Sequence, residues 1–107
     1  MKIQDIQKEI AEWGKYNFPN SEPNDKLMGV MEELGELCHA VLKRKQKIRG
    51  TKYEHDAAEA DAIADLFIFL CHYCSLRGLN LEAIILQTWN QVKQRDWIKF
   101  PKNGLTE

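Results

Sequence analysis

The sequence predicts an all-α protein, a four-helix-type bundle made by a single domain over residues 1–107. Two observations lead to this prediction. Apolar residues recur at helical spacing in four separate segments, and no segment shows the alternation that is typical of a strand. The breaks between the segments contain turn-forming residues, which are Pro19, Pro23, Gly50 and Gly78.

The first two helices are expected over residues 3–16 and 25–48, separated by a loop that contains two prolines. The first carries isoleucines and Trp13 at helical spacing. The second has a long apolar stripe with a period near 3.6, which is typical of a helix that packs on one face. Its members are Leu27, Val30, Met31, Leu34, Leu37, Cys38, Val41 and Leu42.

The last two helices are expected over residues 54–76 and 81–95, with Asn80 as the cap of the fourth. The third is apolar almost all round from residue 57 to residue 74, so we expect it to be buried on most sides. The tail from residue 96 to residue 107 has no helical pattern and is expected to be irregular.

Composition excludes several classes of function. The formal net charge is −1, so the chain has no overall basic field for a nucleic acid polymer. No apolar run reaches the roughly 18 residues of a membrane span, and the first residues lack the apolar stretch of a signal peptide. The three cysteines are too few for a disulfide framework. We therefore expect a cytoplasmic protein without a membrane partner.

Two short acidic strings lie in segments that otherwise look like buried helices. Glu32, Glu33 and Glu36 belong to the second helix, and Asp61 and Asp65 to the third. Residues three or four apart share a helix face, and buried carboxylates need a positive partner. No Lys or Arg occurs between residues 52 and 77. Magnesium is the natural partner, while a solvated acidic face or an arginine from another helix remain alternatives.

The string Glu-Glu-x-x-Glu, followed by a second acidic pair on the next helix, resembles the MazG-like nucleotide pyrophosphohydrolases. These belong to the all-α NTP pyrophosphatase superfamily, and the resemblance extends from Trp13 to Trp97. The second string departs from the usual Glu-x-x-Asp of that family. Position 62 is Ala, and the acid lies one residue earlier, at Asp61, which stays on the same helix face as Asp65.

The resemblance implies a Mg²⁺-dependent enzyme, with Mn²⁺ as a substitute, that cleaves a nucleoside triphosphate between the α- and β-phosphates. The products are a monophosphate and pyrophosphate, and the role is the removal of unwanted nucleotides. The implied metal ligands are Glu33, Glu36, Asp61 and Asp65. Glu32 and Glu33 are the implied catalytic residues, with Glu32 binding a further ion or orienting the attacking water.

The resemblance also implies phosphate ligands near the end of the fourth helix, where we assign Asn90, Lys93 and Arg95. A polar helix end with cations placed favourably for the helix dipole is the alternative. Trp13 and Phe18 are candidates to bind the base because they flank the loop before the second helix, although core packing explains either one more readily. A homodimer or homotetramer is expected, with the site completed across subunits.

Three other interpretations stay open. Ala62 is compatible with a non-catalytic module that keeps the fold and binds a nucleotide or a protein. Glu36-x-x-His39 has the spacing found in di-iron carboxylate bundles, although such sites need two copies. Cys71-x-x-Cys74 has the spacing of a zinc or redox pair, but it lies on an apolar helix, where free cysteines act as small hydrophobic residues.

Overall fold

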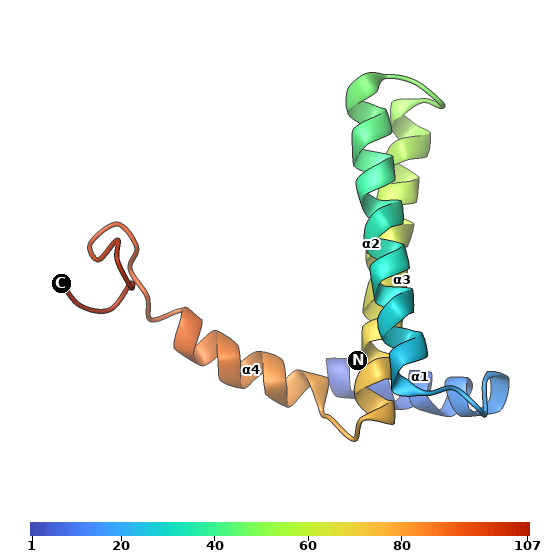
Figure 1. Cartoon of the computed structure of the whole chain (residues 1–107), viewed down its shortest axis with the longest axis horizontal. Helices are drawn as coiled ribbons and strands as arrows, with labels where there is room; N and C mark the ends of the chain where they lie inside the picture. Colours follow the sequence, from blue (N-terminus) through green and yellow to red (C-terminus); the bar gives the residue numbers. More distant parts are fainter.

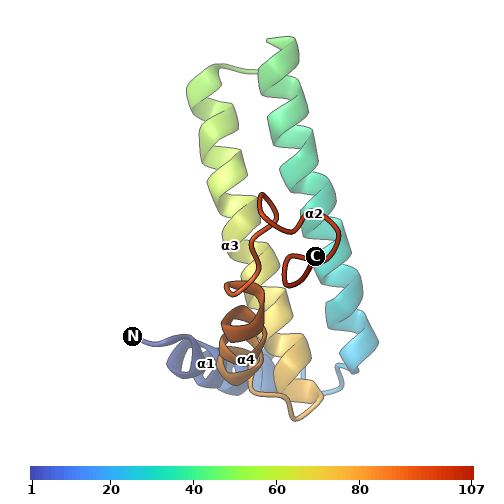
Figure 2. The ribbon, with the colours of Figure 1, turned by 90° about the vertical axis from the view of Figure 1, so that its left-hand side faces the viewer.

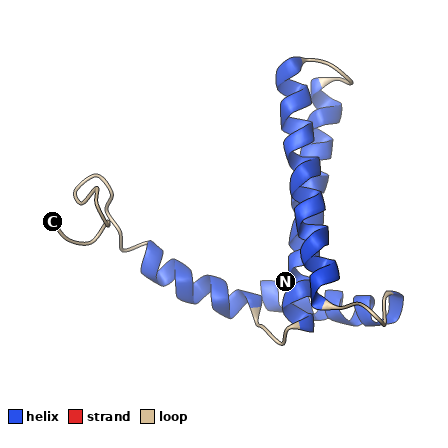
Figure 3. Ribbon diagram, viewed as in Figure 1, coloured by secondary structure: helices blue, strands red, loops and turns tan.

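The computed structural model describes residues 1–107 as a hairpin of two long helices with a shorter helix to either side of its foot (Figure 1). The helices are α1 (Ile3–Asn17), α2 (Pro23–Gln46), α3 (Lys52–Leu76) and α4 (Leu81–Val92). The chain has no strand (Figure 3), so the expected all-α fold with four helices is confirmed.

The antiparallel pair α2 and α3 forms the body of the molecule, because these two helices pack along most of their length. Small residues allow the close approach, since Ala40 and Ala62 are both buried between them. Gly29 is equally necessary, because a Cβ atom at this position would overlap the ring of Phe69. Figure 2 shows the two helices running side by side up to the loop that joins them.

At the tip of the hairpin, ion pairs tie the end of α2 to the start of α3. The guanidinium of Arg44 donates to Asp56 at 2.8 Å and to Glu59 at 2.9 Å. Lys52 adds a third pair with Asp56 at 2.8 Å. These groups are partly exposed, so the pairs fix the register of the tip more than they stabilise the fold.

The helix α1 crosses the foot of the hairpin and packs mainly against α3. Gly14 lies at this crossing, and a Cβ atom there would overlap the imidazole of His72. The buried His72 ring therefore rests on bare backbone of α1. The remaining core at the foot is small and is centred on Cys71, Cys74 and Leu81.

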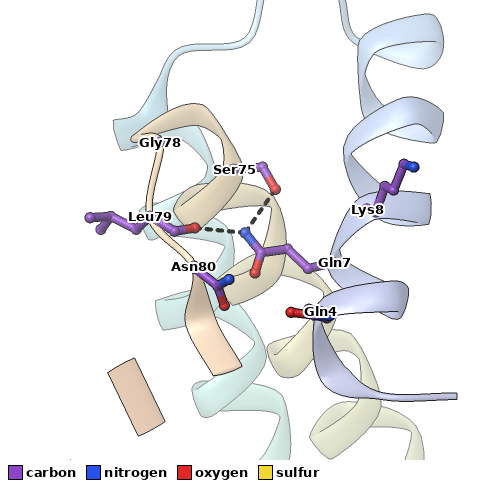
Figure 4. Close-up of a pocket in the computed structure, with 7 residues that line it drawn as sticks. All are labelled: Gln4, Gln7, Lys8, Ser75, Gly78, Leu79 and Asn80. Atoms are coloured by element: carbon purple, nitrogen blue, oxygen red, sulfur yellow. Dashed lines mark hydrogen bonds between the residues drawn. The ribbon is translucent and has the colours of Figure 1, made fainter. Parts of the chain in front are cut away.

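The buried side chain of Gln7 connects α1 to the turn between α3 and α4 (Figure 4). Its Nε2 donates to Ser75 Oγ at 3.1 Å and to the Leu79 carbonyl at 2.8 Å. Its Oε1 accepts from the backbone N–H of Leu81 at 3.0 Å. Leu81 begins α4, where backbone donors lack a partner within the helix, so Gln7 fixes the point at which α4 starts.

The helix α4 then leads away from the hairpin, and the C-terminal tail lies beyond it (Figure 1). Leu81, the first residue of α4, packs with Cys71 and Cys74 of α3 in the core at the foot, and the main helix contacts of α4 are with α1. The radius of gyration is therefore 17.6 Å, against about 13 Å for a compact chain of this length. Only 12 of the 107 residues are buried.

Because α4 does not cover the hairpin, the expectation that the third helix is buried on most sides is wrong for the single chain. Ile63 of α3 is 54% exposed, and Ile68 is also exposed. None of the four helices alone combines the length and apolar character of a membrane span. Only α3 and α4 together meet that measure, and they are bent by 106° at their junction.

Helix boundaries differ from the expected ones for local reasons. The helix α2 begins at Pro23, because proline suits the first helical turn and the Glu22 N–H donates to the Asp25 side chain at 2.9 Å. It ends at Gln46, since Lys47 adopts a left-handed backbone with φ of 59°. Thr51 caps α3, which starts at Lys52, two residues before the expected start. Asn80 caps α4 as expected, but α4 ends at Val92 rather than at residue 95.

Candidate functional site

An open cavity between α2 and α3 brings together the four carboxylates predicted as metal ligands. Glu33 and Glu36 line it from α2, and Asp61 and Asp65 line it from α3. Its volume is about 420 Å³, which lies in the range of ligand pockets. We call it the acidic cavity.

Helix geometry explains why these residues meet. Glu33 and Glu36 are three residues apart on α2, and Asp61 and Asp65 are four apart on α3, so each pair occupies one helix face. The two helices are antiparallel neighbours, and these faces meet at the acidic cavity. Ala62, where the second string departs from the Glu-x-x-Asp pattern, is buried in the wall of the cavity.

The carboxylates influence one another electrostatically. The pKa of Glu33 is raised above its ordinary value, first by loss of hydration and then by the negative charges of Asp65, Glu32, Glu36 and Asp61. None of the chain's three ion pairs involves these acids. Arg49 also lines the acidic cavity, but it forms no ion pair there. The cavity therefore carries negative charge without a paired cation from this chain.

Carboxylate oxygens are the ligands that Mg²⁺ prefers, so the chemistry of the donor set fits this ion. The acidic side chains line a common cavity, but no three acidic, His or Cys side chains lie close enough together to form a metal-binding cluster in this conformation. A resident Mg²⁺ would leave coordination positions for water and substrate oxygens, which is its usual behaviour.

The two candidate catalytic residues occupy different places. Glu33 lies inside the acidic cavity, whereas Glu32 lies on the outer side of α2 in a shallow depression with Gly35, Glu36 and His39. Glu32 thus acts on Glu33 through its charge rather than by lining the same cavity. His39 and Glu36 line both spaces, so the Glu-x-x-His spacing of the sequence lies at the rim of the site.

A second cavity, of about 560 Å³, continues from the first toward the foot of the hairpin. Glu33 and Asp65 line both cavities. We call the second one the aromatic cavity, because its further lining includes three aromatic side chains. The residues other than the two acids are Trp13, Phe18, Lys26, Ile68, Phe69 and His72.

Trp13 and Phe18 form a corner at this cavity, with ring centroids 5.7 Å apart and planes at 71°. Both rings remain about half exposed, at 53% and 47%, so their surfaces can be reached by a planar ligand. The structure thus brings the predicted base-binding residue Trp13 next to the predicted metal ligands.

Asn90, Lys93 and Arg95 are not brought to the acids within this chain. Asn90 lies in the last turn of α4, and the other two follow the helix. Because α4 leads away from the hairpin beyond its first residue (Figure 1), none of the three residues lines either cavity. Their assignment as phosphate ligands stays a prediction.

Two cations near the acids did not stand out in the sequence. Lys26 lies seven residues before Glu33, which is two helical turns along the same face. This spacing could have placed Lys26 on the side of α2 that carries the acids. Arg49 ends a run of residues 43–49 that is rich in Lys and Arg, and nothing in the sequence sets it apart from the others. It lines the acidic cavity because the tip loop folds back with a left-handed backbone at this residue, where φ is 63°.

The cysteine pair has no ligand role in this arrangement. Cys71 is fully buried, and burial, with a smaller effect of Cys74, raises the pKa of its thiol to about 11. Burial also raises the pKa of Cys74. Both thiols belong to the apolar core at the foot, where a protonated cysteine behaves as a small apolar side chain.

The comparison with protein families gives one match, to the family described as phosphoribosyl-ATP pyrophosphohydrolase, over residues 5–94. Neither the curated proteins nor the solved structures contain a match to the chain. The matched family is an all-α family of pyrophosphohydrolase type that is related to MazG, so the resemblance noted in the sequence is confirmed. Since the match covers both acidic strings and far more than half of the residues, the chain belongs to the phosphoribosyl-ATP pyrophosphohydrolase family.

Proposed function

We propose that the protein is a Mg²⁺-dependent nucleoside triphosphate pyrophosphohydrolase, with Mn²⁺ as a substitute metal. The observation that supports this most strongly is the continuity of the two cavities through Glu33 and Asp65. One cavity offers hard oxygen ligands for a metal–phosphate group, and the other offers aromatic surfaces for a base. The family name adds phosphoribosyl-ATP to the substrates that deserve a test.

The order of residues along the hairpin gives the substrate a direction. The aromatic cavity lies toward the foot, the four acids lie in the middle, and Arg49 lies toward the tip. A nucleotide bound along this line has its base against the aromatic side chains of the cavity and its α-phosphate near Glu33 and Asp65. Its β- and γ-phosphates then extend toward Arg49, which neutralises part of the charge on the pyrophosphate that leaves.

The reaction is a displacement at the α-phosphorus by water. The bond from this phosphorus to the bridging α–β oxygen breaks, pyrophosphate leaves, and the monophosphate keeps the oxygen of the water. Bound Mg²⁺ supplies neutralisation of phosphate charge and a more acidic water. Glu33, which lines the acidic cavity, accepts the proton of the attacking water as a general base.

We also propose that the protein works as a homodimer or homotetramer. Large apolar side chains on the uncovered faces support association, among them Ile63 of α3 and Leu86 and Trp89 of α4, each 54% exposed. Such an assembly would let α4 of one copy carry Lys93 and Arg95 to the acids of another.

A substrate screen tests the proposal. Canonical and modified nucleoside triphosphates and phosphoribosyl-ATP are incubated with Mg²⁺, and pyrophosphate, inorganic phosphate and monophosphate are measured. We expect pyrophosphate and monophosphate in equal amounts, and no activity after chelation. Glu36→Gln and Asp65→Asn should lose turnover, whereas Glu9→Gln, an exposed acid on α1, should retain it. Wild-type rates in either site variant would contradict the metal assignment.

A non-catalytic binding module is the second candidate. Two observations favour it: Ala62 stands where the resembling enzymes carry a glutamate, and no ready-made metal group is present. Under this interpretation the protein binds nucleotides but releases no product with any triphosphate, even when Mg²⁺ is saturating and the protein is folded.

A further inference from the structure

Lys26 occupies an unusual position for a lysine. It belongs to the second turn of α2, yet only 7% of its surface is exposed. Its ammonium lies 4.2 Å from the centroid of the Phe18 ring and 5.7 Å from that of Phe69. Both rings line the aromatic cavity, and Lys26 lines it with them. The charge is thus held at the wall of this cavity.

This ammonium has no carboxylate partner. It takes part in none of the three ion pairs of the chain, although Glu33 and Asp65 line the same cavity. Contact with two rings offsets part of the cost of dehydrating the charge. An ammonium nevertheless carries three hydrogen-bond donors and no acceptor, and a ring face satisfies these donors poorly. Since no fully buried side-chain nitrogen of the chain lacks a partner, water reaches this ammonium in the free protein, and a ligand acceptor in the cavity would replace that water.

The location of Lys26 favours the base end of a nucleotide over the phosphate end. Seven residues of α2 separate Lys26 from Glu33, which is about 10 Å along the helix axis. The neighbouring walls are Phe18, Phe69 and Ile68. Such walls suit a planar base, whereas a phosphate group would lose its hydration against them.

His72, which also lines the aromatic cavity, is compatible with this arrangement. It is buried, and burial, with a smaller effect of the Lys26 charge, lowers the pKa of its imidazole. The ring is therefore neutral at physiological pH, and Lys26 is the only cation that lines the aromatic cavity.

We infer that Lys26 selects nucleotides whose base carries an oxo group on the edge remote from the sugar. The ammonium donates to O6 of hypoxanthine or guanine, or to O4 of uracil or thymine. It repels the amino group that adenine and cytosine present at the same place, because both groups are donors. This inference rests on the proposed function, since it assigns the base to the aromatic cavity.

Two matched substrate pairs test it, namely ITP against ATP and UTP against CTP, which differ at this edge. A hydrogen bond to a charged group changes affinity roughly tenfold to a hundredfold. We expect the wild type to favour ITP and UTP by about this factor in kcat/KM, mainly through KM. Lys26→Met, which keeps the length and removes the charge, should bring both ratios near one. The exposed-site variant Lys8→Met should keep the wild-type ratios.

Lys26→Gln serves as a second variant, because its amide both donates and accepts and should also remove the preference. Equal rates for the members of each pair in the wild type would overturn the inference. So would an equal loss for all four substrates in both folded variants, since this would place Lys26 at the phosphates or in the fold alone.

Calorimetric binding of the same four nucleotides separates the two proposals. A preference for oxo bases in binding without hydrolysis would support the role of Lys26 and refute the proposed reaction. Hydrolysis without preference would refute the role of Lys26 and leave the reaction standing. If the protein neither binds nor hydrolyses any of the four nucleotides, both proposals are overturned.

Discussion

Replacing Gln7 with alanine tests whether one buried amide holds the foot of the molecule together. The side chain makes three hydrogen bonds, to Ser75, Leu79 and Leu81, over distances of 2.8 to 3.1 Å. Gln7→Ala removes all three at once. The Leu81 N–H then has no partner within the chain, and Leu81 is only 5% exposed.

The expected loss of unfolding free energy depends on how deeply each hydrogen-bonding partner of Gln7 is buried. An unpaired buried N–H costs about 1–3 kcal/mol, and the other two bonds are replaced in part by water, because Leu79 is 37% exposed. The free energy of unfolding should therefore fall by about 2–4 kcal/mol. Since the slope in urea is about 1–3 kcal/mol per M for small proteins, the midpoint should drop by roughly 1–2 M.

Urea unfolding followed by circular dichroism measures this drop, at one fixed protein concentration so that association does not change the comparison. Gln4→Ala is the matched control, because Gln4 lines the same small cavity from the same helix (Figure 4) but is exposed. It should change stability by less than about 0.5 kcal/mol. Equal midpoints for Gln7→Ala and the control would refute the argument.

Three further predictions concern the acids and the thiols. Asp61→Asn should raise the Mg²⁺ concentration for half-maximal activity about tenfold or more, and an unchanged titration would make Asp61 a bystander. Hydrogen bonds and charges from its two basic partners lower the pKa of Asp56 below its ordinary value of 3.8, so this carboxylate stabilises the fold at neutral pH and loses that effect as pH falls below this value. Asp56→Asn should therefore unfold more easily than wild type at pH 7, and the difference should shrink as pH falls below 3.8, as thermal melts across pH will report. Alkylation of the native protein at pH 8 should label only Cys38, because the other two thiols are buried; labelling of three before unfolding would contradict the core assignment.

Much of the fold follows from the sequence because helical spacing is a local signal. The four helices occur where the apolar periodicity places them, and four of their eight ends shift by two or three residues. The starts of α2 and α3 shift for reasons of capping, at Pro23 and Thr51. The direction of α4 does not follow, since it depends on the buried amide of Gln7, which contacts residues more than 65 positions away. The sequence pattern around a glutamine in an amphipathic helix does not indicate such long-range hydrogen bonds.

Some residues of the candidate site could also be predicted from the sequence, and others could not. The four acids on facing helices were predictable, because spacing within each helix fixes the face that they share. Lys26 was not, because a lysine near the start of a helix is normally solvated, and only the packing of Phe18 and Phe69 buries it. The distance of Asn90 from the acids also lies beyond sequence spacing, since it follows from the path of α4.

In the tip loop, the backbone conformation at one residue lowers the stability of the fold, while the side chain of the same residue brings a positive charge to the acidic cavity. Arg49 has φ of 63°, a conformation that costs an L-residue about 1–2 kcal/mol and costs glycine almost nothing. Selection for a more stable fold alone would favour glycine at this position, while the acidic cavity would lose the one cation that lines it. With arginine there the free protein carries the strain at all times, whereas under the proposed function the charge acts only while an anion is bound. Replacement of Arg49 by glycine is therefore a change that would stabilise the fold and, under the proposed function, impair activity.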